Sequence, residues 1–483
     1  MSNDYTPTLE ECRRIGVTEY PVAVSREVFA DLDTPVSAYL KVREAGPSFL
    51  LESVEGGQSL GRYSFIGSRP RRVLRVAEGM QRFDNDPPQP CADPLQAIRT
   101  MVDAYGPAPT PDARFEGGAV GYLSYEAARW FERIPLAAED PLSLPDAVFL
   151  DIDTVLIFDH VRRKIRIVSH AWPSDSIERS YACAVDRIDE IAQRLEQPVD
   201  APPLPAPVLL KPGSNLKPSE FEDMVTAGKK HIRAGNILQV VLSQRLSMPL
   251  EGDPFGLYRR LRTVSPSPYM YYLDLGDHQL VGASPELLIQ VEGGVVSSRP
   301  IAGTRRRGRN REEDATLAED LVADEKERAE HLMLVDLARN DVGRVSAAGS
   351  VEVSNFMGVE QFSHVMHMVS DVTGRLAPGR SPYDALRAAF PAGTVSGAPK
   401  IRAMQIISEL ERDQRGSYAG AAGFISKGGN METAITIRTG LIKNGVLHVQ
   451  AGAGIVADSV PEREYVESMN KARAMLEAAG GAS

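Results

Sequence analysis

Residues 330–341 read Glu-His-Leu-Met-Leu-Val-Asp-Leu-Ala-Arg-Asn-Asp. The run places acids, a histidine and an arginine in a stretch whose apolar residues otherwise predict a buried helix. Burying a charge without a partner is unfavourable, so the pattern indicates a nearby cation, substrate or paired side chain. Glu327 and Glu330 share a helix face. Two carboxylates ~4 Å apart repel by roughly 4 kcal/mol at an effective dielectric constant near 20, and a divalent cation between them reverses the sign. A surface helix rich in acids explains the same pattern.

A second acidic run lies near the C-terminus, where residues 464–471 read Glu-Tyr-Val-Glu-Ser-Met-Asn-Lys. Glu464, Glu467 and Lys471 fall on one face of the expected helix. The simplest interpretation is a solvated face with an ion pair between Glu467 and Lys471. The alternative is a carboxylate that binds Mg²⁺ beside a lysine that binds a substrate carboxylate, because Mg²⁺ usually takes one or two protein carboxylates, waters and the substrate. The two runs together predict that distant acidic helices converge on one metal-dependent site.

Composition and charge argue against several classes of protein. The 483-residue chain is 43% hydrophobic and 25% charged, and it is long enough for two or more domains. Its net charge of −11 argues against a general nucleic-acid binder, which needs a basic surface. The N-terminus does not resemble a signal peptide, and no apolar run approaches the ~20 residues of a membrane span. The three cysteines show neither metal-site nor disulfide spacing, so we expect a cytoplasmic protein without nucleic-acid or membrane partners.

The densest break in the chain is the proline-rich segment 198–218. Proline removes backbone donors and favours extended conformations, so this segment predicts a linker between residues 1–197 and 219–483. Beyond it we expect, among other elements, a helix over 312–340 and a strand over 432–441.

Short turns at residues 427–430 and 443–445 indicate hairpins, which favour antiparallel strands. The order of strands and helices is therefore typical of an α+β fold and not of a regular βα alternation.

Small residues gather in three segments, 300–304, 392–400 and 450–454. Such turns let backbone N–H groups approach an anion closely, although each is also compatible with a plain turn. Arg438 is a charge in an expected buried strand, so it requires an anionic partner. His367 suits proton transfer by its ordinary pKa, with a structural histidine as the alternative.

Taken in order, segments 282–286, 300–304, 330–341, 393–400 and 452–454 resemble the chorismate-utilising enzymes, and most closely the component I family of anthranilate synthase. The resemblance implies the chorismate-binding fold, with two packed antiparallel sheets flanked by helices. It also implies the Mg²⁺-dependent conversion of chorismate and ammonia to anthranilate and pyruvate, the first committed step toward tryptophan.

The same resemblance implies roles for individual residues. Glu330 and Glu467 match the metal ligands. Glu286 matches the acid that protonates the departing C4 hydroxyl, His367 matches the group that handles a proton at C2, and Thr394 is a third candidate catalytic residue. The positions that match binding residues for the substrate are Gly303, Thr304, Tyr418, Arg438, Gly452, Ala453, Gly454 and Lys471.

Two positions separate this chain from relatives. Aminodeoxychorismate synthases commonly carry a nucleophilic lysine where this chain has Ala302, and isochorismate and salicylate synthases carry a lysine base where it has Gln239. A neutral amide cannot deprotonate water, so ammonia is the expected nucleophile. An aminodeoxychorismate synthase, and a relative that stops at the aminated intermediate as an aminodeoxyisochorismate synthase does, are the alternatives. A non-catalytic regulator that binds chorismate or tryptophan is a reading of a different class.

Regulation and partners also follow from the resemblance. Glu52, Ser53, Pro268, Tyr269 and Met270 match the tryptophan-inhibition site, although a buried strand and a proline-initiated strand explain the same residues. No cysteine stands in a setting typical of a glutaminase nucleophile. We therefore expect a separate glutamine amidotransferase subunit to supply ammonia, in a complex that the resemblance implies is a heterotetramer.

Overall fold

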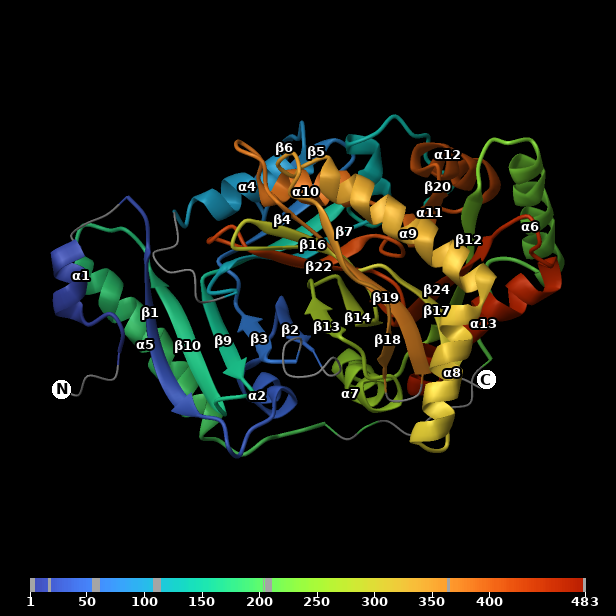
Figure 1. Ribbon diagram of the computed structural model, residues 1–483. Helices are drawn as coiled ribbons and strands as arrows, with labels where there is room; N and C mark the ends of the chain where they lie inside the picture. Colours follow the sequence, from blue (N-terminus) through green and yellow to red (C-terminus); the bar gives the residue numbers. More distant parts are fainter. Residues whose placement is uncertain are drawn as a thin grey trace.

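Two large antiparallel sheets form the centre of the molecule, and helices cover their outer faces (Figure 1). The computed structural model describes residues 5–15, 19–53, 61–106, 114–202, 204, 211–362 and 365–480. This arrangement confirms the expected α+β fold with two packed sheets. Within the described residues, no helix combines the length and the apolar character that crossing a bilayer requires.

Sheet A contains twelve strands. In spatial order they are β1 (Val22–Phe29), β10 (Lys164–Ala171), β9 (Thr154–Asp159), β3 (Tyr63–Ser68), β2 (Ser48–Glu52), β13 (Tyr269–Asp274), β14 (His278–Ser284), β23 (Thr439–Lys443), β24 (Val446–Ile455), β12 (Gln239–Pro249) and β11 (Gly213–Ser214), with β20 (Gly397–Ala398) also paired to β12.

Sheet B also contains twelve strands. Their order is β17 (Ile301–Arg306), β19 (Val365–Arg375), β16 (Val295–Ser298), β15 (Leu287–Glu292), β22 (Met431–Ile435), β21 (Ala421–Ser426), β7 (Gly118–Leu123), β8 (Ala147–Ile152), β4 (Arg72–Ala77), β5 (Met80–Phe83) and β6 (Gln89–Pro90), with β18 (Glu352–Gln361) also paired to β19. The two hairpins expected at 427–430 and 443–445 are present as β21–β22 and β23–β24.

The helices lie outside the two sheets (Figure 1). They are α1 (Leu9–Ile15), α2 (Pro35–Val42), α4 (Pro94–Asp103), α5 (Ile177–Leu195), α6 (Pro218–Arg233), α7 (Pro254–Val264), α8 (Arg311–Ala323), α9 (Glu325–Gly343), α10 (Pro382–Ala389), α11 (Gly393–Ser396), α12 (Lys400–Leu410) and α13 (Pro461–Ala478), together with a 3₁₀ turn at Tyr125–Trp130.

Adjacent residues of β2 show how the layers pack. Phe49 belongs to the apolar cluster between the sheets, where it meets Phe115. Leu50 points to the opposite face, because successive side chains of a strand alternate. It joins the cluster that α2, α5, α7 and α13 form with sheet A. The core is therefore a helix–sheet–sheet–helix arrangement, with a third cluster that packs sheet B against its helices and extends to α6, β12 and β24.

Strands from both sides of the proline-rich segment share each sheet. In sheet A, β2 pairs with β13, with Glu52 opposite Met270. In sheet B, β7 pairs with β21, with Gly118 opposite Ser426. Residues 203 and 205–210 of the segment lie outside the described residues. The division into 1–197 and 219–483 thus stays a prediction about the sequence, whereas the sheets themselves are continuous across it.

The single strand expected over 432–441 was wrong. The chain leaves sheet B at Ile435, crosses through Thr436, Ile437 and Arg438, and enters sheet A as β23. Arg438 has a φ angle of +48°, which no regular strand permits. Apolar residues on both sides of the crossing hid it, because each half is buried in its own sheet.

The helix expected over 312–340 was also wrong, because it is two helices that meet at Asp324. The Asp324 side chain accepts hydrogen bonds from the backbone N–H groups of Lys326 and Glu327, which caps α9. The buried face of α9 carries His331, Leu334, Val335 and Ala338. Glu330 lies off that face and is exposed, so the helix is not buried all round as its apolar residues suggested.

Because the sheets share strands from both halves of the chain, we expect the protein to unfold in one transition. Leu50→Ala removes a fully buried side chain from β2 and should lower the free energy of unfolding by about 2–5 kcal/mol. Leu32, which is 93% exposed, provides the matched control. Leu32→Ala should change the free energy of unfolding by less than about 0.5 kcal/mol. Urea denaturation followed by circular dichroism and tryptophan fluorescence measures both. Two separate transitions would contradict the shared architecture.

Candidate active site

One cavity of about 620 Å³ gathers residues from many separate elements. Its walls come from α9, α11, α13, β12, β17, β19 and β24, and from the two segments that cross between the sheets. The predicted catalytic, substrate-binding and metal-binding residues that line it are Glu286, Gly303, Thr304, Glu330, His367, Thr394, Tyr418, Arg438, Gly452, Gly454, Glu467 and Lys471. Ala453 is the exception. Its side chain is buried in the core, on the face of β24 opposite to Gly452 and Gly454.

Glu286 lies in the crossing from β14 to β15, and Arg438 lies in the crossing from β22 to β23. The two crossings lie side by side. The backbone N–H of Ile435 donates to the Glu286 carbonyl over 3.0 Å, and the N–H of Ala283 donates to the Arg438 carbonyl over 3.2 Å. Desolvation raises the pKa of the Glu286 carboxyl to about 7, against the opposing effects of the Thr394 hydroxyl and the cations Lys471 and Arg438. Near neutral pH, Glu286 can therefore hold a proton and donate it.

His367 is oriented by a bulge in β17. The strand pairing with β19 shifts between Ala302 and Thr304, and Gly303 adopts a φ angle of +66° that favours glycine. The Gly303 carbonyl lies 2.9 Å from His367 Nδ1. Burial lowers the pKa of His367, so the ring is neutral at physiological pH. With Nδ1–H donating to Gly303, Nε2 is the nitrogen that can accept a proton.

Gly452 and Lys471 form another part of the wall. A Cβ atom at Gly452 would lie 2.5 Å from the Leu242 carbonyl and 3.0 Å from the Tyr418 hydroxyl, so only glycine fits there. Lys471 Nζ donates to the Gly452 carbonyl over 3.1 Å and also lies 2.8 Å from Glu467 Oε1. The ion pair that the helical spacing suggested is thus present, and it faces the cavity.

The acidic side chains converge as the two runs predicted. Glu327, Glu330 and Glu467 all line the cavity, the first two from α9 and the third from α13. Desolvation raises the pKa of Glu330, and the charges of Glu327 and Glu467 raise it further. Among the described residues, no three acids, histidines or cysteines are placed to hold an ion together. Two carboxylates that repel each other nevertheless fit Mg²⁺, which commonly completes its shell with water and substrate oxygens.

Several cavity residues were not predicted from the sequence, among them Lys326 and Gln450. Lys326 precedes Glu330 by one helical turn, and Gln450 precedes the glycines of β24. Lys326 stands in no motif and Gln450 opens the small-residue segment 450–454, so the place of their side chains in the wall depends on the tertiary arrangement. Of the two positions that separate the relatives, Ala302 lines the cavity, and the Gln239 amide packs against Gly454.

The five predicted effector residues line a second, smaller cavity of about 50 Å³. Glu52 is almost fully buried there, and its carboxylate lies 2.5 Å from the Tyr258 hydroxyl and 3.2 Å from Arg262 Nε. Pro268 lines both this cavity and the larger one. A cavity of roughly 150 Å³ accommodates benzene, so an indole ring requires side chains to move on entry.

Comparison with known proteins agrees with this geometry. A family model described as chorismate binding enzyme matches residues 46–477. The chain belongs to the chorismate-binding enzymes. It is 46% identical to anthranilate synthase component 1 of Acetivibrio thermocellus, covering 98% of each chain. It is also 49% identical to anthranilate synthase component 1 of Thermus thermophilus, covering 93% of this chain and 96% of the relative.

Solved structures show the same fold for this chorismate-binding enzyme. Anthranilate synthase component I from Streptococcus pneumoniae superposes with a TM-score of 0.79 at 40% identity, covering 93% of this chain and 98% of that chain. The menaquinone-specific isochorismate synthase MenF from Escherichia coli gives a TM-score of 0.71 at 18% identity, covering 98% of this chain and 99% of that chain, which demonstrates a shared fold alone.

The titration of Glu286 tests the electrostatics of the cavity. In the free chorismate-binding enzyme, we expect its carboxyl to stay protonated below pH 7 and to ionise as the pH rises through about 7, because desolvation disfavours the charged form. Infrared difference spectra of wild type minus Glu286→Gln isolate its carbonyl band. A band that is already lost between pH 4 and 5, the ordinary range for glutamate, would contradict a desolvated carboxyl.

Proposed function

We propose that this chain catalyses the synthesis of anthranilate from chorismate and ammonia, with pyruvate and water as the other products. The observation that carries the proposal is the single cavity, which a protonatable acid, a neutral histidine, three cations and paired carboxylates line together. Each of these groups has a task in the reaction. The names of the relatives support the same activity.

Protonated Glu286 donates its proton to the C4 hydroxyl as that group leaves as water, while ammonia attacks the ring at C2. This allylic displacement gives an aminated intermediate. The new ammonium group loses a proton to the Glu286 carboxylate. His367 Nε2 then accepts the C2 proton, the bond from C3 to the enol oxygen breaks with aromatisation of the ring, and the released enolpyruvate takes up a proton at its methylene carbon to become pyruvate. Arg438 and Lys471 bind the substrate carboxylates and orient the ring for both steps.

We assign the metal site to Glu330 and Glu467, which would hold Mg²⁺ from α9 and α13. When bound, the ion neutralises the ring carboxylate of chorismate. Lys471 holds the Glu467 carboxylate in place, because the two groups form an ion pair of 2.8 Å.

Ala302 and Gln239 favour anthranilate synthase over the related enzymes. Ala302 lines the cavity where an aminodeoxychorismate synthase places a nucleophilic lysine, and alanine cannot form a covalent adduct. Gln239 cannot activate water as a lysine base does. Ammonia is therefore the nucleophile that the wall permits.

The source of ammonia is a second subunit in this proposal. A glutamine amidotransferase chain pairs with this one, and the family resemblance implies two copies of each in the complex. Alone, the chain should use free ammonium at raised pH and should not use glutamine.

Incubation of the chain with chorismate, Mg²⁺ and ammonium should yield fluorescent anthranilate and an equal amount of pyruvate. EDTA should reduce the rate by about 100-fold or more, because a bound cation supplies several kcal/mol of charge stabilisation. Excess Mg²⁺ should restore it. An aminated, non-aromatic product would favour the rival branches, and a rate that EDTA leaves unchanged would refute the metal assignment.

Feedback inhibition by tryptophan is the regulatory part of the proposal. The small cavity lies where β2 meets β13, and the segment from Val264 to Pro268 continues from it into the wall of the active site. Tryptophan in the small cavity would displace this segment and so change the substrate-binding wall.

Ser53→Phe should fill the small cavity and abolish inhibition by tryptophan, with turnover in the absence of tryptophan largely unchanged. Ser53→Ala is the matched control, because it leaves the cavity open and should preserve inhibition. Rates measured across a tryptophan titration decide between them. Equal loss of turnover and inhibition in Ser53→Phe would argue against a separate effector site.

A further inference from the structure

The deepest charge near the active site belongs to Arg415. It follows α12 in the chain, and it is the largest side chain among the fully buried ones of the described residues, with 2% of its surface exposed. A buried guanidinium needs a carboxylate and additional acceptors, because desolvation otherwise outweighs the attraction. Its partners therefore reveal what holds it there.

Arg415 binds Glu411 through two parallel contacts. Nε donates to Oε2 over 2.8 Å and Nη2 donates to Oε1 over 2.6 Å. The remaining donors reach the backbone of the cavity wall, with Nη2 lying 2.7 Å from the Val241 carbonyl and Nη1 lying 2.8 Å from the Val395 carbonyl. Val241 and Val395 both line the active-site cavity, from β12 and α11.

The guanidinium also packs against aromatic rings. Its central carbon lies 5.5 Å from the ring centre of Tyr418 and 4.7 Å from that of Tyr125. Both distances are typical of cation–π contacts. Tyr418 is a predicted substrate-binding residue, so Arg415 contacts a third component of the cavity wall.

Glu411 connects Arg415 to a fourth residue of the cavity wall, Gln450, through Ser243. Its Oε1 accepts hydrogen bonds from the Ser243 backbone N–H over 2.8 Å and from the Ser243 hydroxyl over 2.9 Å. A carboxylate can only accept, so the Ser243 hydroxyl must donate to it. The Ser243 oxygen then accepts from Gln450 Nε2 over 2.9 Å, which orients the amide of this cavity residue.

We propose that Arg415 is a positioning residue of the active site, which acts through the fork of its guanidinium. With Glu411 it joins Val241, Val395, Tyr418 and Gln450, four cavity-lining residues from separate segments, to one buried ion pair. The inference rests on the proposed function and deepens it, because it names what holds the substrate-facing wall in register. Lysine has the same charge but a single donor atom, so it cannot serve the carboxylate and both carbonyls together.

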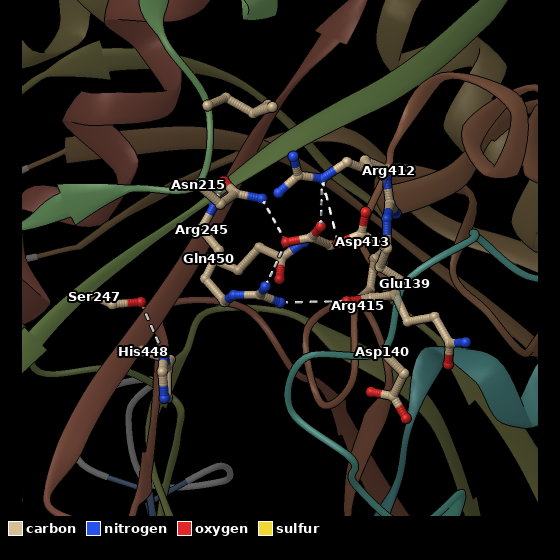
Figure 2. A network of polar contacts seen from close by, with 12 residues as sticks. Glu139, Asp140, Asn215, Arg245, Ser247, Arg412, Asp413, Arg415, His448 and Gln450 are labelled. Atoms are coloured by element: carbon tan, nitrogen blue, oxygen red, sulfur yellow. Dashed lines mark hydrogen bonds and ion pairs between the residues drawn. The ribbon is translucent and has the colours of Figure 1, made fainter.

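A neighbouring ion pair offers a matched control. Arg245 and Asp413 are as deeply buried, with Nη2 and Oδ2 2.6 Å apart, and Asn215 and Arg412 complete the contacts of Asp413 (Figure 2). The other bond of the Arg245 side chain reaches the Gln414 carbonyl. None of these partners lines the cavity.

The test compares Arg415→Lys with Arg245→Lys in the full chain. We expect both to lower Tm, whereas only Arg415→Lys lowers kcat with chorismate and ammonium, by about 10- to 100-fold, since misplaced wall residues weaken transition-state contacts. Arg245→Lys should keep kcat/KM within about twofold. Equal activity of the two variants at equal loss of Tm would overturn the proposal.

Two further measurements keep the test decisive. If Arg415→Lys does not fold, Ser243→Ala removes the hydroxyl that joins Glu411 to Gln450, keeps the Ser243 backbone bond to Glu411, and should lower kcat/KM by about fivefold to tenfold. An unchanged kcat/KM in that variant overturns the proposal.

If wild type makes no anthranilate, the proposed function fails, and calorimetric binding of chorismate then tests Arg415 alone. Arg415→Lys should weaken that binding, and unchanged affinity counts against a positioning role.

Discussion

The two side-by-side crossings between the sheets are the constraint on which the site depends. At each crossing the backbone leaves one sheet before it has joined the other, so its polar groups must find partners. They find them in each other, through the bonds that link Ala283 to Arg438 and Ile435 to Glu286. The Ser284 hydroxyl adds a bond of 2.7 Å to the Ile435 carbonyl. This pairing fixes the Glu286 carboxyl and the Arg438 guanidinium at the floor of one cavity.

The rest of the site completes the charge pattern of that floor. Helices α9 and α13 bring carboxylates to the wall, where desolvation raises the pKa of Glu330 and the charges of Glu327 and Glu467 raise it further. Arg438 has the reverse problem, because burial lowers the pKa of its guanidinium and only Glu286 opposes that shift. A divalent cation would offset the repulsion between the carboxylates, and a carboxylate of the substrate would pair with the buried Arg438 guanidinium. The cavity thus suits a ligand that carries two anionic groups.

Local pattern predicted the elements that pack locally and failed where the partner lies far away in sequence. The hairpin turns near 427–430 and 443–445 were recognisable because turn residues separate apolar runs. The break at Asp324 and the crossing before Arg438 were not, because the charged residues after Asp324 suit a helix surface as well as a helix start, and apolar residues stand on both sides of the crossing. The convergence of the two acidic helices was predicted from their charge pattern, whereas the roles of individual site residues came from resemblance to a family. Lys326 belongs to no motif and Gln450 opens the small-residue segment 450–454, so only the folded arrangement places both side chains in the cavity.

The central claim is that Glu330 and Glu467, far apart in the chain, hold one divalent ion beside Glu286 and Arg438. Mn²⁺ gives an anomalous X-ray signal and can replace Mg²⁺ at oxygen-rich sites. The most direct measurement is an anomalous difference map from crystals grown with Mn²⁺ and a stable analogue of chorismate. The account predicts one peak between the Glu330 and Glu467 carboxylates, within reach of the ligand. A peak elsewhere, or none at full occupancy of the analogue, would contradict it.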